Sequence, residues 1–234
     1  KAIIVTIYDG FVKFLGIYWE PPKYKPIKKI PFIPTEAEID QFIGACGKKL
    51  ATFMQLLKET GMRCGEASLL KWTDLDYERR LVRITPEKNS NPRILKISTK
   101  LLGMLNNLPK TTDRIFSGSL RSMKSNIQLS RKGIARKLNN PRLLKISFHT
   151  MRHWKGTTEY HKTRDIIHIQ KVLGHRDIKS TMIYITLENS IFDTVNDEFH
   201  VKATKSVDEA CKLVESGFEF VTDIDEVHIF RKRK

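Results

Sequence analysis

Six polar side chains in this chain are of types that together could attack a phosphodiester without a metal ion. They are two arginines, a lysine, two histidines and a tyrosine: Arg63, Lys88, His149, Arg152, His175 and Tyr184. An attacked phosphate gains negative charge in its transition state, so fixed cations must meet it. The planar guanidinium of arginine suits this task because it can bond two phosphate oxygens at once. The residue types therefore predict metal-independent breakage of a nucleic-acid strand.

Local spacing predicts how most of these side chains are positioned. Arg63 begins a helix, where backbone amides also favour anions, and Glu66 lies one turn later, where it can hold the arginine. His149 and Arg152 are three residues apart and therefore share one helical face. A histidine beside an arginine suits a shared phosphate, because one group exchanges protons while the other binds charge. His175 follows a glycine just past a helix end, from which its ring can project into a cleft.

The tyrosine and the lysine complete the set. Tyr184 is the predicted nucleophile, but its phenol, with a free pKa of about 10, must first lose or share its proton. Lys88 lies in a turn between two predicted strands and could protonate a leaving alkoxide if neighbouring arginines lower its pKa. Rivals for that task are Lys71, Arg83 and Arg93. Each position alone is also typical of a solvated basic face, a surface ion pair or a half-buried helix residue, so the prediction depends on the whole set.

The composition points to the same class of partner. The chain of 234 residues has 42 Lys and Arg against 26 Asp and Glu, a net charge of +16 that is typical of a polyanion binder. A basic protein that is merely soluble is the alternative. The three cysteines (Cys46, Cys64 and Cys211) show no pairing pattern, no apolar run approaches the roughly 20 residues of a membrane span, and the start lacks the order of a signal peptide. We therefore expect a cytoplasmic protein associated with the nucleoid.

Other chemistries find little support in the sequence. Four histidines recur at intervals of seven or eight residues: His153, His161, His168 and His175. Most of them would lie on different helices, and the chain contains no HExxH motif, so we expect no zinc site. No GxxxxGK[ST] loop is present to bind the phosphates of a nucleotide. The predicted activity needs neither ATP nor another cofactor.

The periodicity predicts an α+β fold that is mainly α-helical, with one small antiparallel sheet. A capping box at Thr35 and Glu38 opens the first helix of the main domain. Further helices are expected at 48–60, 63–71, 99–107, 119–138, 149–161, 164–173 and 179–186, and strands at 81–85 and 93–97. An apolar helical segment (1–20) and a basic, proline-rich linker precede this domain. A short helix (188–199) and a small strand–helix–hairpin appendage follow it, with strands at 199–203, 218–222 and 227–230 and a helix at 206–216.

The order and spacing of these motifs resemble the tyrosine recombinase, or phage integrase, family. The matching features are Arg63 with Glu66, the hairpin lysine, the His-x-x-Arg box, the Leu-Gly-His box and Tyr184, with Thr181 just before it. The resemblance covers about residues 32–186, and the sequence around the His-x-x-Arg box is similar to that of archaeal integrase-type members. It implies a remnant of the core-binding domain with its linker in 1–31, a recombinase catalytic domain in 32–187 and a C-terminal extension in 188–234.

The resemblance also implies a mechanism. Tyr184 would attack the scissile phosphate to give a 3′-phosphotyrosine, while Arg63, Arg152 and His175 bind the phosphate oxygens. His149 would assist proton transfer, and Lys88 would protonate the leaving oxygen. Members usually act as tetramers on paired sites in double-stranded DNA. The basic residues expected to contact DNA are Lys23, Lys25, Lys28, Lys29, Lys71 and Arg93.

The chain departs from the family pattern at both ends. Without a complete core-binding domain its DNA affinity is open, and the segment after Tyr184 is longer than the expected terminal helix. Our hypothesis is that this extension mediates subunit contacts. Two alternative functions also stand beside the recombinase: a DNA-binding module with a silent active site, and an enzyme like the type IB topoisomerases that relaxes DNA alone.

Overall fold

The computed structural model describes residues 2–22, 29–87, 90–192, 199–224 and 227–233. Contacts along the chain divide it into two compact units, Lys1–Pro31 and Phe32–Lys234, which are described separately. Within the described residues, none of the helices combines the length and the hydropathy that a membrane span requires.

The first unit contains one helix, α1 (Ala2–Phe14), and the segment that follows it. The ring of Trp19 packs edge-on against Tyr8, with 4.8 Å between the ring centroids, so the chain folds back on the helix. Three of the linker lysines predicted to bind DNA lie outside the described residues: Lys23, Lys25 and Lys28. Lys29 is described and exposed.

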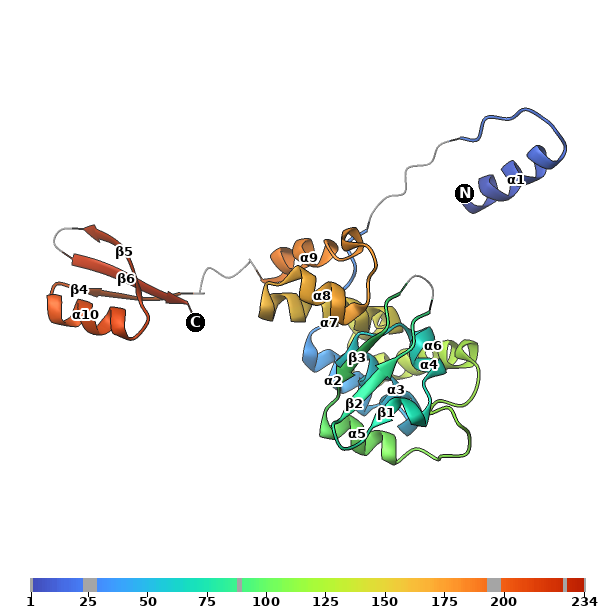
Figure 1. Cartoon of the computed structure of the whole chain (residues 1–234), viewed down its shortest axis with the longest axis horizontal. Coiled ribbons are helices and arrows are strands. Elements are labelled where there is room, and N and C mark those ends of the chain that lie inside the picture. Colours follow the sequence, from blue (N-terminus) through green and yellow to red (C-terminus); the bar gives the residue numbers. More distant parts are fainter. Residues whose placement is uncertain (1, 23–28, 88–89, 193–198, 225–226, 234) are drawn as a thin grey trace. The chain divides into compact units, whose positions relative to one another are not determined.

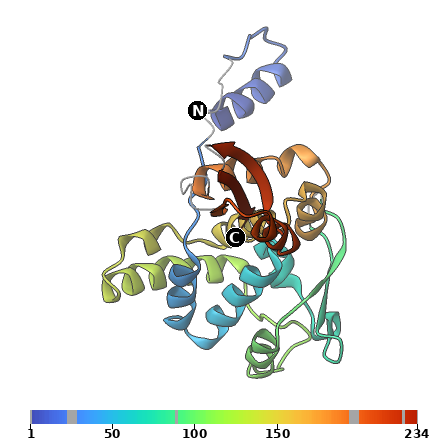
Figure 2. The same cartoon turned by 90° about the vertical axis from the view of Figure 1, so that its left-hand side faces the viewer.

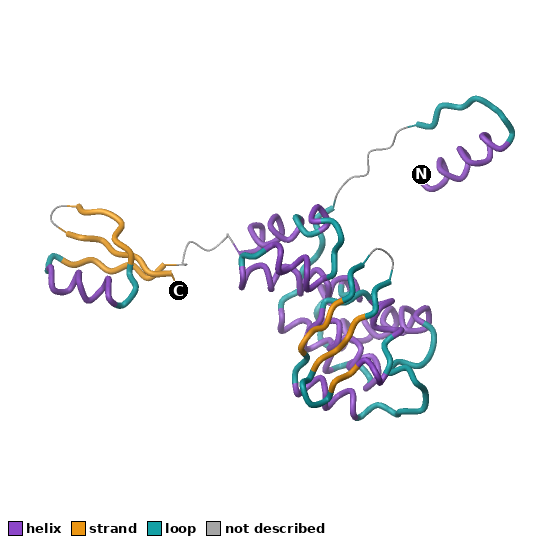
Figure 3. The backbone as a smooth tube through the Cα atoms, in the orientation of Figure 1, coloured by secondary structure: helices purple, strands orange, loops and turns teal. Residues whose placement is uncertain are grey.

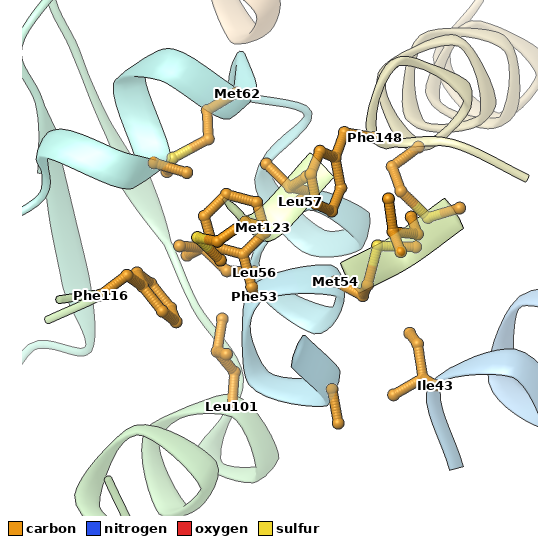
Figure 4. Packing of buried hydrophobic residues seen from close by; sticks show 14 of the residues in the cluster. Ile43, Phe53, Met54, Leu56, Leu57, Met62, Leu101, Phe116, Met123 and Phe148 are labelled. Carbon is orange, nitrogen blue, oxygen red and sulfur yellow. The ribbon is translucent and has the colours of Figure 1, made fainter. Parts of the chain in front are cut away.

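The main core of the second unit lies in residues 32–187, which we call the catalytic part after the family resemblance. It is built around α3 (Lys48–Thr60), which is buried along most of its length. Phe53 from the middle of this helix contacts Phe116 and Phe148 edge-on, at centroid distances of 4.9 and 5.0 Å. Figure 4 shows these rings together with Leu56 and Met123 in one apolar cluster. Close packing of this kind fixes α3 as the element against which the others are placed.

Two short helices flank α3 in sequence. Before it, α2 (Glu36–Gly44) begins at the predicted capping box, since Thr35 accepts from the amide of Glu38 and the Glu38 carboxylate accepts from the amide of Thr35. After it, the chain turns at Gly61 and enters α4 (Cys64–Leu69). Both boundaries agree with the sequence prediction.

A three-stranded antiparallel sheet, in the order β1-β2-β3, covers one side of the catalytic part (Figures 1 and 3). Its strands are β1 (Leu75–Asp76), β2 (Leu81–Ile84) and β3 (Arg93–Lys96). Val82 and Ile84 point into the core and Arg83 points to solvent, as the alternation of a strand requires. The two-residue strand β1 is an element that the sequence analysis did not predict.

Two further helices complete this side of the molecule. They are α5 (Thr99–Asn106) and the long α6 (Leu120–Lys137), which is followed by a 3₁₀ turn at Pro141–Lys145. Figure 2 shows the returning segment beside α6, with which it is in contact. The predicted helices at 99–107 and 119–138 match them closely.

Three helices carry the last part of the predicted site: α7 (Phe148–Thr163), α8 (Ile166–Leu173) and α9 (Ile183–Phe192). They enclose a second, smaller apolar cluster around Ile169, Leu173 and Leu187. The break predicted between helices at 179–186 and 188–199 was wrong, because α9 continues through residue 187; residues 193–198 of the second predicted helix lie outside the described residues. Instead a 3₁₀ turn, Ile178–Ser180, precedes the single helix α9, because the Asp177 side chain accepts from the amide of Lys179 and stabilises a tight turn there.

The C-terminal segment folds as the predicted strand–helix–hairpin. It comprises β4 (Phe199–Thr204), α10 (Val207–Glu215), β5 (Glu219–Ile224) and β6 (Val227–Arg233). The last strand inserts between the other two, giving the order β4-β6-β5, and α10 contacts the two outer strands. The fold class is therefore confirmed: a mainly helical α+β chain with small antiparallel sheets.

Candidate active site

Arg152 is the most firmly held of the predicted site residues. Its side chain is buried near the start of α7, and its guanidinium donates to the carbonyls of Gly61 and Leu173, both at 2.8 Å. These carbonyls end α3 and α8, so one arginine joins the ends of two helices. Burial, together with the nearby charge of Arg63, lowers the pKa of Arg152 to about 10, so it remains a cation near pH 7.

Arg63 lies where predicted, directly before α4, and the buried carboxylate of Glu66 contacts both its backbone and its side chain. The Glu66 carboxylate accepts from the backbone amide of Arg63 at 2.8 Å, and its other oxygen lies 3.5 Å from Arg63 Nη1. That nitrogen is buried and has no hydrogen-bond partner among the described atoms. A buried guanidinium nitrogen without a partner is costly, and an anion bound in the site would satisfy it.

Glu66 in turn is held by Arg93. The Arg93 guanidinium forms a two-pronged ion pair with the Glu66 carboxylate, with contacts of 2.8 and 3.3 Å, and its side chain is only 6% exposed. Burial would raise the pKa of Glu66, but the hydrogen bonds and charge of Arg93 outweigh it, so the pKa is lowered. We predicted DNA contact for Arg93, whereas its buried position fits the support of Glu66 and, through it, of Arg63.

The hairpin after β2 docks on the Leu-Gly-His turn. Gly174 ends α8 with a φ of 69°, and a Cβ there would lie 2.6 Å from the Arg93 guanidinium and 3.0 Å from the Asn91 carbonyl. Its carbonyl accepts from the Asn91 amide and the Ser90 hydroxyl, both at 3.0 Å. Only glycine meets both requirements, the left-handed backbone and the close approach. Ser90, the first described residue after the gap at 88–89, pairs with His175 in this turn. The predicted Lys88 lies outside the described residues.

His175 is buried beside the predicted nucleophile. Its Nδ1 lies 2.9 Å from the Thr181 hydroxyl, which orients the ring. Burial and the charges of Arg152 and Arg63 lower the pKa of His175 to about 4, so the ring is neutral near pH 7. A neutral imidazole held in this way keeps one ring nitrogen for a hydrogen bond to a ligand.

Tyr184 lies near the start of α9 with its ring parallel to that of His175. The two ring planes differ by 7°, the centroids are 6.4 Å apart, and the Tyr184 side chain is almost fully buried. The ring packs on Gly156 of α7, where a Cβ would lie 2.5 Å from two of its carbons. Burial raises the pKa of Tyr184 to about 12, although the charges of Arg152 and Arg63 act to lower it. The phenol is therefore neutral at pH 7 and needs a proton acceptor to react.

His149 and its neighbour one turn later, His153, form a pair of rings 4.4 Å apart. His149 is exposed at the cleft, yet partial burial and the charges of Arg152 and Arg63 lower its pKa, so it is available as a proton acceptor near pH 7. Burial and the nearby His149 lower the pKa of His153 to about 4. Its ring centroid is 6.1 Å from that of Tyr184, and its buried Nδ1 has no partner among the described atoms.

An open cleft of about 250 Å³ joins these groups at the surface. Arg63, His149 and Arg152 line it together with Glu87 and Lys124. The fold thus brings together the five predicted catalytic residues that the structure describes: three line this cleft, and His175 and Tyr184 lie close enough for the charges of Arg152 and Arg63 to act on their pKa values. Among the described residues, no three His, Cys, Asp or Glu side chains converge as a metal site would need.

Sequence reasoning missed three residues of this site. Lys124 lies on α6 and Glu87 in the hairpin, and both line the cleft. Glu87 packs so closely on Gly65 that any side chain there would overlap its carboxylate. His153 was considered only as a metal ligand. The signal for Lys124 was its place on a helix with six basic and no acidic residues, whereas nothing local in the sequence places Glu87 beside α4.

Two further residues predicted to contact DNA are described, and both are exposed. Lys71 pairs with Asp113 at 3.0 Å, and Lys29 lies in the first unit. Arg83, a rival of Lys88 in the sequence analysis, is exposed on β2.

The sequence profile of the phage integrase family matches residues 34–190, about two thirds of the chain. The chain belongs to the phage integrase family. As a member it is a tyrosine recombinase, a DNA strand transferase by class, and the sequence-based expectations of family and enzyme class are confirmed.

Archaeal tyrosine recombinases are among its relatives. The chain is 26% identical to tyrosine recombinase XerA of Saccharolobus solfataricus over 214 residues, which cover 88% of this chain and 69% of the relative. It is 29% identical to XerA of Pyrococcus furiosus over 195 residues, which cover 78% and 68% of the two chains.

Solved recombinase structures share the fold. The structure of a lambda integrase dimer bound to a COC′ core site is similar with a TM-score of 0.60 at 16% identity, covering 82% of this chain and 60% of that one. A post-cleavage complex of XerH recombinase with palindromic difH substrate matches with a TM-score of 0.55 at 22% identity, covering 69% and 51%. This chain therefore spans about half to two thirds of the length of the recombinases that it matches.

Proposed function

We propose that this chain cleaves and rejoins double-stranded DNA at specific sites through a covalent 3′-phosphotyrosine at Tyr184. The observation that carries the proposal is the Nη1 of Arg63, which is buried at the cleft that Arg152 also lines. Its ion-pair contact with Glu66 is 3.5 Å long, and it has no hydrogen-bond partner among the described atoms. Two guanidinium groups facing one small open cleft form a site for an anion of phosphate size. The parallel rings of His175 and Tyr184 are close enough for the charges of Arg152 and Arg63 to act on the pKa of each.

Each described group has a task that its surroundings support. Arg152 and Arg63 bind the phosphate oxygens and stabilise the charge that develops on them. His175, oriented by Thr181, donates to a third position on the phosphate. His149, neutral and exposed at the cleft, accepts the proton of the phenol as it attacks. Lys88, which lies outside the described residues, is assigned the protonation of the leaving 5′ oxygen by the family resemblance alone.

The reaction conserves bond energy. Attack by the phenol oxygen forms the phosphotyrosine and releases a 5′-hydroxyl, and attack by the hydroxyl of a partner strand reverses the step. No cofactor is consumed. DNA-complex structures of recombinases with this fold and the charge of +16 support double-stranded DNA as the partner, and we propose a tetramer on paired sites acting at the nucleoid.

A covalent trapping assay tests this function. The chain is incubated with nicked duplexes of randomised core sequence, in which the fragment after the cleavage site diffuses away and traps the adduct. We expect a protein–DNA adduct that maps to Tyr184 in the wild type and is absent from Tyr184→Phe. DNA binding without any adduct in the wild type would favour the silent binding module.

Supercoiled plasmid provides a second measurement that separates the remaining alternative. A recombinase exchanges strands between two sites, whereas an enzyme like the type IB topoisomerases relaxes supercoils by acting alone. Relaxation with no exchange between sites would favour the topoisomerase reading.

A further inference from the structure

A fully buried carboxylate lies one turn after the proposed nucleophile. Glu188 follows Tyr184 by four residues on α9, and its side chain has no exposed surface. A buried carboxylate persists only when cations and hydrogen-bond donors hold it in place. The partners of Glu188 therefore reveal which element fixes α9.

Both partners come from the end of α7. His161 Nδ1 lies 2.7 Å from one oxygen of Glu188, and the Arg164 guanidinium pairs with the other. Because an ionised carboxylate only accepts, the Nδ1 of His161 carries the proton in this contact. The His161 ring also stacks on Phe192 at the last position of α9, with 3.8 Å between ring centroids. The last two turns of α9 are thus tied to α7.

The backbone at Arg164 is unusual in a way that serves this contact. Arg164 ends α7 in the left-handed conformation, with a φ of 53°, where glycine is the ordinary residue. An L side chain is strained there, and such strain persists where the surrounding structure compensates it. The ion pair with Glu188 is the compensation that the structure shows.

The position of α9 decides where the phenol lies. Tyr184 packs on Gly156 of α7 and stacks beside His175 of the same chain. We propose that Glu188, His161 and Arg164 form a latch that holds the nucleophile helix in the active site of its own subunit, so that cleavage occurs in cis. These are positioning residues, and the proposal rests on the proposed function for Tyr184.

Hydrogen exchange of the α9 amides tests the latch without depending on activity. In Glu188→Gln and Arg164→Gly, we expect the amides of residues 185–192 to exchange at least ten-fold faster than in the wild type, while those of α3 remain unchanged. Arg164→Gly removes the side chain that pairs with Glu188, and glycine readily adopts the left-handed backbone at this position. We therefore expect this variant to fold even if Glu188→Gln does not. Unchanged exchange of α9 in folded Arg164→Gly overturns the latch.

Glu159 offers a matched control. It also lies on α7 and pairs with a lysine and a histidine, Lys155 and His168, but it does not hold α9. Glu159→Gln removes a comparable carboxylate, and we expect no change in α9 exchange. An equal acceleration in Glu159→Gln would show a general loosening of the three helices and would overturn the specific role of Glu188.

Mixing two inactive variants tests cleavage in cis. Tyr184→Phe lacks the nucleophile and Arg63→Ala lacks a phosphate ligand, so an adduct in the mixture requires one subunit to lend its tyrosine to the other. With an intact latch we expect none, and recovery of the adduct would overturn the proposal. If the wild type alone forms no adduct, the proposed function has failed, and the exchange experiment still decides whether the latch exists.

Discussion

The active-site region and the C-terminal extension differ in which side chains they bury. The active site buries charged side chains, whereas the extension leaves large apolar side chains exposed. In the active site, the charged side chains of Glu66, Arg93 and Arg152 are buried and paired. In residues 199–233, apolar side chains such as Val201, Val207 and Phe220 are more than half exposed. The extension also contains an open apolar pocket of about 500 Å³ between α10 and the sheet.

Charge divides the two regions in the same way. Residues 199–234 contain seven Lys and Arg and seven Asp and Glu, so the whole net charge of +16 lies in residues 1–198. A polyanion is attracted to residues 1–198 and not to the extension. The charge distribution favours DNA binding by the catalytic part. It also agrees with our hypothesis that the extension contacts a second copy of this chain.

The largest expected effect tests the chemical half of this comparison. Tyr184→Phe removes only the phenol oxygen, so we expect the covalent adduct to fall by at least about three orders of magnitude, because no other group supplies the nucleophile. Thermal unfolding of the variant should stay within a few degrees of the wild type, since the ring still packs on Gly156. An undiminished adduct in Tyr184→Phe would refute the assignment.

Arg152→Ala should reduce single-turnover cleavage by about 10²–10³-fold, because a fixed cation is removed from the developing charge. It should also lower the free energy of unfolding by about 1–3 kcal/mol, since the carbonyls of Gly61 and Leu173 lose their partner. Arg83→Ala, on the exposed face of β2, is the matched control and should change neither quantity appreciably. A loss confined to DNA affinity would argue against a role in the transition state.

Stability should fall with acid below about pH 6.5 because the site holds its histidines neutral. The pKa values of His153 and His175 are lowered to about 4, below the unfolded value of about 6.5, so the unfolded state binds more protons in between. The stabilisation is complete above about pH 6.5 and is lost as the pH falls toward 4, by roughly 2–3 kcal/mol for each group. Denaturant unfolding across this range should show a weaker dependence in His175→Asn, and an identical slope would contradict these pKa shifts.

The smallest effect on chemistry is expected from removing the extension. Deletion of residues 200–234 should leave cleavage of the nicked substrate within about two-fold, since the described catalytic groups all lie before it. Assembly on paired DNA sites should decrease, which sedimentation of the protein–DNA complex would measure. An unchanged oligomer would remove subunit contact as the role of the extension.

Sequence reasoning found the elements whose signals are local. The capping box at Thr35, the helix end at Gly61 and the alternation of Val82 and Ile84 each follow from neighbouring residues, and the structure agrees with them. It failed at α9, where two short helices were predicted. The helix begins only after the turn at Asp177 and Lys179, and it then continues without the predicted break.

The roles of charged residues were harder to predict than their positions. Arg93 was expected on the DNA, but it lies buried on Glu66, and Glu188 carried no signal at all. The reason is physical: whether a charge is solvated or paired depends on which distant cation the fold brings to it, and the partners here lie 24–27 residues away.

The sequence by itself determined the residue types of the site, their order and the charge that attracts a polyanion, because these depend on composition and on spacing within single helices and turns. The tertiary structure alone decided that Tyr184 is buried and neutral, that a buried Arg63 nitrogen has no hydrogen-bond partner among the described atoms, and that Glu188 ties α9 to α7. Burial and pairing are properties of surfaces brought together from different elements. They set the pKa values and the mobility on which the chemistry depends.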